Sequence, residues 1–133
     1  PKLIAADTDG FYMQWTARNG SNNGTGWTNP LYAFDPDGKE LRSFEMNTGL
    51  AEGMQKASAS GPAFVTRDYV GFTGRGLFRI FDKKTGSAVG DIIYQIDDKV
   101  YTPDTIATDD TNHVYFTLYD NKQKVQHIYR IDL

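Results

Sequence analysis

The residues best placed to do chemistry are pairs of carboxylates in tight turns. Asp7 and Asp9 lie one residue apart in the run DTDG, and Asp35 and Asp37 repeat this spacing in DPDG. Calcium loops use such spacing because a hard cation takes several oxygen ligands from one turn. Neither run supplies the further acidic ligands of a complete loop, and Asp-Gly turns also close hairpins. We therefore predict hairpin turns and no cofactor, with calcium at these four carboxylates as the alternative.

Histidine chemistry would require His113 and His127 to converge, since they are the only two histidines. A last hairpin closed between Tyr119 and Val125 does not make them cross-strand neighbours. The 133 residues contain no cysteine, which excludes disulfides, thiolate zinc sites and a cysteine nucleophile. No nucleophile, histidine and acid stand in a recognisable arrangement. We therefore predict no catalytic residue.

Ligand binding is expected in loops, which carry binding more often than the strands they join. Residues 18–30 are rich in Gly and Asn, and they are predicted to be a long loop that holds Trp27. Trp27 and Arg18, together with Arg75 in a second glycine-rich turn, are the predicted ligand-binding residues. For Trp27 the alternative is packing over a sheet edge. Arg67 and Arg79 are predicted to lie on the solvated surface, with anion contacts as the alternative.

Composition indicates an all-β protein. Aromatic residues make up 14% of the chain, and Gly, Asp, Asn and Thr recur between short apolar runs. The formal charge of −3, with no long run of either sign, argues against nucleic acid as a partner. No apolar stretch is long enough for a membrane-spanning helix. The sequence leaves the compartment open, and a periplasmic or extracellular location is favoured over others.

Strand-like runs recur in three units, at residues 2–46, 63–94 and 105–133. A stretch of the chain at 47–62 is predicted to be a connecting loop with at most one helical turn. Each unit carries the same two anchors in the same order. The first anchor reads IAAD at 4–7, VTRD at 65–68 and IATD at 106–109, and the second reads LYAFD at 31–35, LFRIFD at 77–82 and IYRID at 128–132. A period of about 40–50 residues with four strands per unit is typical of β-propeller blades.

The distribution of apolar residues separates a propeller from a β-sandwich. If Tyr119 pairs with Val125, Phe116 lies opposite Ile128 on one face of the last hairpin, and the other face also carries large apolar side chains. A sandwich sheet with one wet face should alternate more cleanly, whereas a blade is covered on both faces. We therefore predict about three antiparallel propeller blades, the last lacking its outermost strand, with a β-sandwich as the alternative.

Two stretches resemble a known repeat family. LYAFDPDGK at 31–39 and LFRIFDKKTG at 77–86 are similar to the strand-and-turn core of quinoprotein-like (PQQ-repeat, YVTN-type) β-propellers. The resemblance extends over the three units and implies a propeller architecture rather than one activity. The tryptophan that the family's repeats often place after Thr-Gly is missing from residues 87–91.

Three blades cannot close a ring, so residues 1–133 are expected to form one partial-propeller domain. The missing blades would come from the same longer chain, from identical copies or from another chain. The first functional hypothesis is a non-catalytic binding or scaffolding module. The alternatives are a portion of a propeller enzyme, such as a quinoprotein-like dehydrogenase or a lyase, and a structural subunit of an extracellular assembly. An enzyme should gather titratable residues near Asp7, Asp68 and Asp109, whereas a binding module should present an aromatic patch carried by loops.

Overall fold

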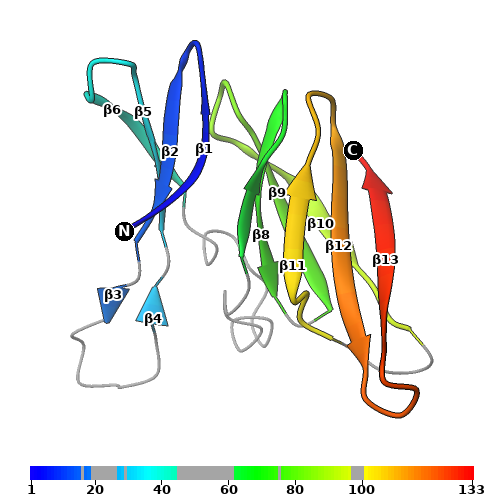
Figure 1. Ribbon diagram of the computed structural model, residues 1–133. Coiled ribbons are helices and arrows are strands. Elements are labelled where there is room, and N and C mark those ends of the chain that lie inside the picture. The colour runs from blue at the N-terminus through cyan, green and yellow to red at the C-terminus, as the bar shows by residue number, and fades with distance from the viewer. Residues whose placement is uncertain (16, 19–26, 29, 45–61, 75, 97–100) are drawn as a thin grey trace.

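The computed structural model describes residues 1–15, 17–18, 27–28, 30–44, 62–74, 76–96 and 101–133. In this part of the chain there is no helix, and three antiparallel sheets of four, four and three strands are accompanied by a two-stranded ribbon (Figure 1). The predicted all-β class is therefore confirmed. The strands are β1 (Lys2–Asp7), β2 (Gly10–Gln14), β3 (Ala17–Arg18), β4 (Trp27–Thr28), β5 (Leu31–Phe34), β6 (Glu40–Phe44), β7 (Ala63–Val65), β8 (Tyr69–Gly74), β9 (Leu77–Asp82), β10 (Ala88–Ile93), β11 (Thr105–Thr108), β12 (His113–Asp120) and β13 (Val125–Asp132).

The first sheet has the order β1-β2-β5-β6. Its last hairpin is closed by Asp35, whose Oδ1 accepts hydrogen bonds from the backbone N–H groups of Asp37 (3.0 Å) and Lys39 (2.8 Å). Gly38 follows with φ 86°, a conformation that glycine adopts without steric cost. This is the hairpin turn predicted from the run DPDG. The carboxylate serves the turn because it satisfies backbone donors that the ladder leaves unpaired.

The ribbon of β3 and β4 lies between β2 and β5 in the sequence, with Ala17 paired to Thr28 and Arg18 paired to Trp27. The prediction of an irregular loop beginning at Arg18 is therefore wrong at both of its ends, where the backbone pairs. Each of these strands has only two residues, which is too short for an alternating apolar pattern, so the sequence did not indicate the pairing. The connecting loop predicted at 47–62 lies outside the described residues, apart from Pro62.

The second sheet, of order β10-β9-β8-β7, follows the same plan. Its outer hairpin is closed by Asp82, whose Oδ1 accepts hydrogen bonds from the backbone N–H groups of Lys84 and Thr85 and from the Thr85 hydroxyl. The second anchors of the first two units thus have one physical role. Each ends a third strand with an Asp that organises the turn behind it.

The third sheet, of order β11-β12-β13, has three strands as predicted, but the predicted hairpin register is wrong by one residue. The turn closes between Asp120 and Val125 rather than at Tyr119, because the Asp120 carboxylate accepts N–H groups of the turn. Phe116 consequently lies opposite Tyr129 instead of Ile128. This shift gathers the large apolar residues of β12 and β13 on one face and leaves a mixed face on the other.

The register also moves both histidines. His113 lies opposite Asp132 rather than Ile131, and His127 lies opposite Leu118 rather than Thr117.

Two hydrophobic clusters hold the sheets together. One joins the first sheet to the second, and the other joins the second sheet to the third, so the middle sheet is covered on both faces. The first cluster contains Tyr12, Leu31, Ala33, Phe44, Ala63, Val65, Val70, Phe72, Leu77 and Phe81. The second contains Phe64, Phe78, Ile80, Val114, Phe116 and Leu118.

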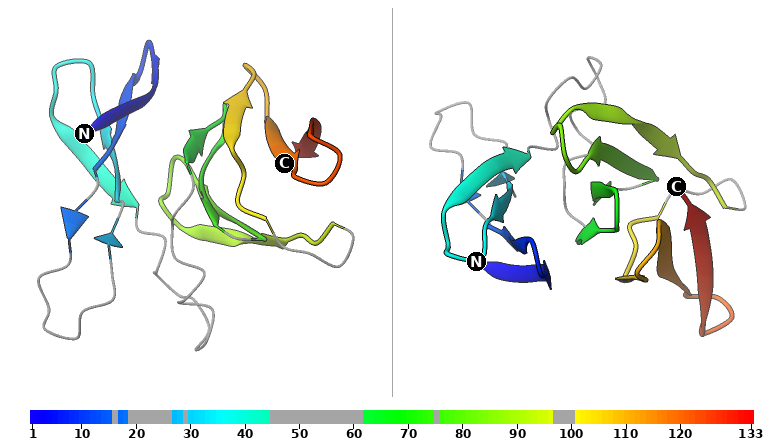
Figure 2. Two further views of the ribbon diagram at one scale, coloured as in Figure 1. Left: turned by 60° about the horizontal axis from the view of Figure 1, so that its bottom comes forward. Right: turned by 90° about the horizontal axis from the view of Figure 1, so that it is seen from above.

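Seen from above, the three sheets fan out from a common side (Figure 2). The first strands β1, β7 and β11 lie on that side, and β7 contacts both of the others. The last strands β6, β10 and β13 lie at the outside of the fan. The fan therefore brings the first turn of each sheet to one end of the molecule.

Candidate functional site

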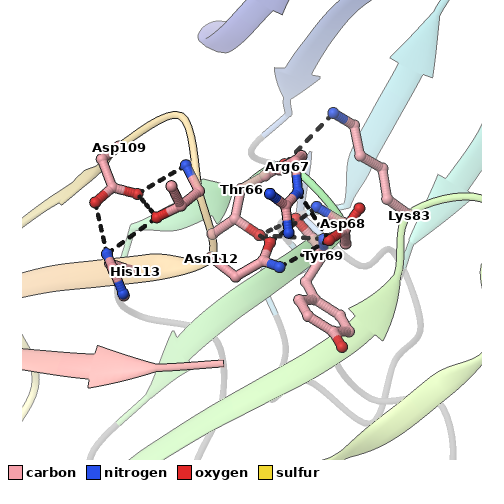
Figure 3. Close-up of polar contacts among 9 residues, drawn as sticks. Thr66, Arg67, Asp68, Tyr69, Lys83, Asp109, Asn112 and His113 are labelled. Atoms are coloured by element: carbon pink, nitrogen blue, oxygen red, sulfur yellow. Dashed lines mark hydrogen bonds and ion pairs between the residues drawn. The ribbon is translucent and has the colours of Figure 1, made fainter.

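The turn that follows β7 is joined to the turn that precedes β12 by an amide bridge (Figure 3). Asn112 donates from Nδ2 to the Asp68 carboxylate at 2.7 Å. Its Oδ1 accepts hydrogen bonds from the Asp68 backbone N–H (3.0 Å) and the Thr66 hydroxyl (3.1 Å). The Asn112 amide lowers the pKa of Asp68, and the neighbouring Arg67 guanidinium lowers it further. One side chain thus ties the second sheet to the third.

A second polar group in Figure 3 surrounds His113 at the start of β12. Its Nδ1 lies 2.8 Å from Asp109 Oδ2, and its Nε2 lies 3.7 Å from Asp132 Oδ1. Hydrogen bonds from the Thr111 hydroxyl, and then from His113 and the Thr111 backbone, hold the pKa of Asp109 well below its ordinary value. The imidazole therefore lies between two carboxylates on one sheet and helps to fasten its first turn to β13.

An ion pair connects the first and second sheets. Lys83 Nζ lies 3.2 Å from Asp7 Oδ2 and 5.3 Å from the centre of the Tyr12 ring. Burial opposes ionisation of Asp7, but the hydrogen bonds from Asp9 N–H and Lys83 outweigh it and lower the pKa. Burial, reinforced by the Asp7 charge, raises the pKa of Tyr12 to about 12. This pair lies in a recess that also carries Arg42.

The three aspartates that end the first strands are thus engaged in turns and in contacts between sheets. Asp7 contacts Lys83, Asp68 contacts Asn112, and Asp109 contacts His113. In the described residues no three histidine, aspartate or glutamate side chains are grouped to hold a metal ion. Asp7 and Asp68 thus fasten one sheet to the next, whereas Asp109 and His113 fasten the first turn of the third sheet to β13.

A different kind of site covers the outer face of the first sheet. Phe11 stacks on Phe34 with ring centres 5.0 Å apart and an interplanar angle of 14°. Trp15 meets the Tyr32 ring edge-on at 5.3 Å. We call this surface, with Met13 between the rings, the open aromatic face. A recess of about 330 Å³ on it is lined by Trp15, Pro30, Tyr32, Phe34 and Glu40.

Equivalent positions in the other two sheets are buried, except that Ile131 is half-buried. In each sheet the residue before the closing Asp pairs with a residue of the second strand: Phe34 with Phe11, Phe81 with Val70, and Ile131 with Val114. Val70 and Val114 are fully buried because the preceding sheet packs on them. Phe11 and Phe34 are only half-buried, and no described strand covers them (Figure 2). The open aromatic face is therefore a packing face that has no sheet on it within the described chain.

The outer face of the third sheet is also uncovered by the residues that the structure describes, and we call it the open mixed face. It carries Tyr115, Thr117, Ile128 and Arg130. The hydroxyl groups of Thr105 and Thr117 are 2.7 Å apart, and Ile128 is 75% exposed. This face therefore carries both polar and apolar side chains.

The structure describes two of the three residues predicted to bind a ligand. Trp27 and Arg18 are cross-strand partners at the backbone level, and Arg75 lies outside the described residues. Of the calcium candidates, Asp7 Oδ1 accepts the N–H of Asp9, as Asp35 Oδ1 accepts that of Asp37. These turns place the carboxylates as hairpin caps.

One predicted surface residue is in the core. Arg79 is only 4% exposed and faces the first sheet, with its guanidinium carbon 5.7 Å from the centre of the Phe81 ring. Its Nη1 lies 3.6 Å from Asp91 Oδ2. The prediction of a solvated Arg79 is therefore wrong, because the second sheet is covered on that face. Arg67, by contrast, is exposed as predicted.

Sequence reasoning missed the open aromatic face and the Asn112 bridge. The face could have been found by aligning the second anchors, since that alignment places Phe34 at the position of Phe81. Nothing in the sequence marked Asn112, because its partners are 44 and 46 residues away.

Among the residues that the structure describes, no helix is long and apolar enough to cross a bilayer. Comparison with known proteins gives no significant match to a family model, to a curated protein or to a solved structure.

Proposed function

We propose that this chain is a non-catalytic binding and scaffolding module, built from β-propeller-type blades, that works as part of a larger or oligomeric propeller. The observation that carries the proposal is the open aromatic face. Val70 and Val114, which are equivalent to Phe11, are fully buried under a neighbouring sheet. Of the residues equivalent to Phe34, Phe81 is buried and Ile131 is half-buried. The open aromatic face therefore has the composition of an interface. The fan of sheets with β1, β7 and β11 on one side supports the propeller-type architecture.

Binding is favoured over catalysis because the titratable groups are already engaged. Asp68 and Asp109 bond to Asn112 and His113, and Asp7 bonds to Lys83. A propeller enzyme would need such groups to be directed at a substrate rather than at each other. The aromatic rings, in contrast, have exposed area, and no sheet of the described residues packs on them. Rings of this kind supply much of the free energy of protein association.

The proposal is tested by photo-crosslinking in the native cell. A photoreactive phenylalanine analogue at Tyr32 should crosslink to a protein segment, because Tyr32 lies on the open aromatic face. The same analogue at Lys39, in an exposed turn, is the matched control and should give little crosslinking. Absence of a crosslink at Tyr32, in a folded protein, would show that the face is not a binding surface. Identification of the crosslinked segment then identifies the partner.

A further inference from the structure

We infer that the partner of the open aromatic face is the open mixed face of a second copy of this chain. This inference rests on the proposed function and gives it a specific occupant. The third sheet of one copy would pack on the first sheet of the next, as the first packs on the second and the second on the third within one chain.

The contacts inside the chain indicate which residues should meet. Phe78 projects from the second sheet onto Phe116 of the third, with ring centres 5.0 Å apart. Counted from the closing Asp of each unit, Ile128 occupies the position of Phe78. Met13 occupies the position of Phe116. The residue before the closing Asp pairs with Phe11 in the first unit and with Val114 in the third. Met13 and Phe116 each follow that paired residue by two positions. Ile128 of one copy should therefore insert at Met13 of the other.

Exposure supports this pairing. The position that Ile128 occupies is filled by Leu31 in the first sheet and by Phe78 in the second, and both are 0% exposed. Ile128 itself is 75% exposed. An apolar residue thus occurs at this position in all three sheets, although only two of the three positions are covered within the described chain. A partner sheet on the third would bury it in the same way.

The two open faces carry charged side chains of opposite sign. The recess of the aromatic face carries Glu40, and the mixed face carries Arg130, whose Nε also lies 2.8 Å from Asp132 Oδ1. Arginine is compatible with an aromatic surface, since its planar guanidinium stacks on rings. The interface between the first two sheets already contains such a contact, Arg79 over Phe81. Opposite charges at the rim would favour docking of the third sheet over docking of two aromatic faces on each other.

Such a contact joins different surfaces of the two copies. A head-to-tail contact forms a closed ring when its rotation closes, and otherwise forms an open filament. With two copies, each third sheet would cover the partner's first sheet, which would remove both open faces. A symmetric dimer of six sheets is therefore the expected assembly.

The experiment uses the complete absence of cysteine in the 133 residues. Copies carrying Ile128→Cys are mixed with copies carrying Met13→Cys and treated with a short bis-maleimide. The expected result is a crosslinked dimer in the mixture and none with either variant alone. Ile93→Cys, at a position on the middle sheet that is 68% exposed, replaces Ile128→Cys in the matched control and should give no crosslink. Crosslinking of Met13→Cys copies to each other, without Ile128→Cys, would instead show that two aromatic faces dock, and would overturn the inference.

Light scattering gives the second readout. The unmodified chain should be dimeric, and Ile128→Lys should raise the dimer dissociation constant by at least about tenfold, while Ile93→Lys leaves it unchanged. A chain that stays monomeric at every concentration overturns the inference. The proposed function would survive that result if the Tyr32 photo-crosslink joined a different protein segment, and it would fail only if that crosslink were absent as well.

Discussion

Phe78 in the middle sheet and Ile128 in the third sheet occupy the same position of the same repeat, yet one is 0% exposed and the other 75%. Both are apolar, and both lie on a third strand across from a threonine, Thr73 and Thr117. The difference is therefore set by the neighbouring sheet and not by the residue or its strand. Within this fold, burial of a sheet face therefore depends on whether another sheet packs on it.

The largest difference should appear when these two residues are truncated. Phe78 packs against Phe64, Tyr94 and Phe116, with ring centres 5.0–6.1 Å apart. Phe78→Ala removes these contacts and leaves a cavity between two sheets. We expect it to lower the free energy of unfolding by about 3–5 kcal/mol. Denaturant titration at a fixed low protein concentration measures the change.

Truncation of Ile128 to Ala is the experiment to compare with Phe78→Ala. Under conditions in which the chain is monomeric, this variant should change the free energy of unfolding by no more than about 0.5 kcal/mol, because the side chain is exposed. A loss comparable to that of Phe78→Ala would mean that the mixed face is covered within the monomer, and the comparison would fail.

Glycine-to-alanine substitutions also compare a packed position with an open one, because each adds a methyl group. A Cβ at Gly71 would lie 2.1 Å from Phe64 Cζ and 2.8 Å from the backbone oxygen of Arg79. Because the middle sheet is packed on both faces, the aromatic ring has little space to move away. Gly71→Ala should therefore cost about 1–3 kcal/mol of stability by overpacking. Thermal or chemical denaturation would measure it.

Gly90→Ala is the matched control on the outer strand of the same sheet. No atom lies within 4 Å of a Cβ built there, so little effect on stability is expected. Equal losses from the two variants would argue that the cost at Gly71 comes from the backbone and not from packing between the sheets.

The polar bridge between the second and third sheets should matter less than their apolar contact. Asn112→Ala removes hydrogen bonds to Thr66 and to Asp68. We expect a loss of about 1–2 kcal/mol, as for a few partly buried hydrogen bonds. Hydrogen exchange should show faster exchange at the Asp68 N–H, which loses its acceptor. An unchanged exchange rate there would indicate that water replaces the amide without cost.

These comparisons also show what could be predicted from the sequence. The three strand groups were predicted correctly because each depends on local patterns, namely alternating apolar residues ended by an Asp turn. Asp35 and Asp82 end third strands and accept N–H groups of the following turn, as their spacing to the next glycine suggested. Strand ends differ from the predicted ones by only a few residues for the same reason.

The register of the β12–β13 hairpin could not be predicted from such local patterns. A turn closed at Tyr119 and one closed at Asp120 differ by one residue, and both leave polar residues in the turn. The choice depends on the Asp120 carboxylate, which accepts the N–H groups of Lys122 and Gln123. A single residue of register moves every side chain of the strand relative to its partner, and therefore decided where His113 and Ile128 lie.

Contacts between sheets were the other feature that the sequence could not predict. Arg79 reads as a surface residue because arginine is rarely buried, and only the packing of the first sheet on the second covers it. The open aromatic face was equally hidden, since Phe11 and Phe34 resemble core residues until the missing neighbour is seen. Both features depend on which sheet faces which, and no local pattern contains that information.

The smallest effect should be the response of the polar bridges to acid. The ionised forms of Asp68 and Asp109 are favoured in the folded state, Asp68 by Asn112 and Asp109 by Thr111 and His113, so the pKa of each is lowered from 3.8. This contribution to stability is complete above the unfolded-state pKa and is lost as the pH falls through the lower folded-state pKa. We therefore expect the free energy of unfolding to decrease from about pH 4 downward.

Two variants assign this acid response to the bridge between the second and third sheets. Asp68→Asn removes one of the titrating carboxylates, and Asn112→Ala removes the main hydrogen bond that lowers its pKa. Both should make the dependence of unfolding free energy on pH shallower below pH 4, although Asn112→Ala is also less stable at neutral pH. Urea titrations at a series of pH values measure the slope. If Asp68→Asn keeps the slope of the unmodified chain, the acid response lies in other carboxylates, and the bridge joins the sheets through its neutral hydrogen bonds alone.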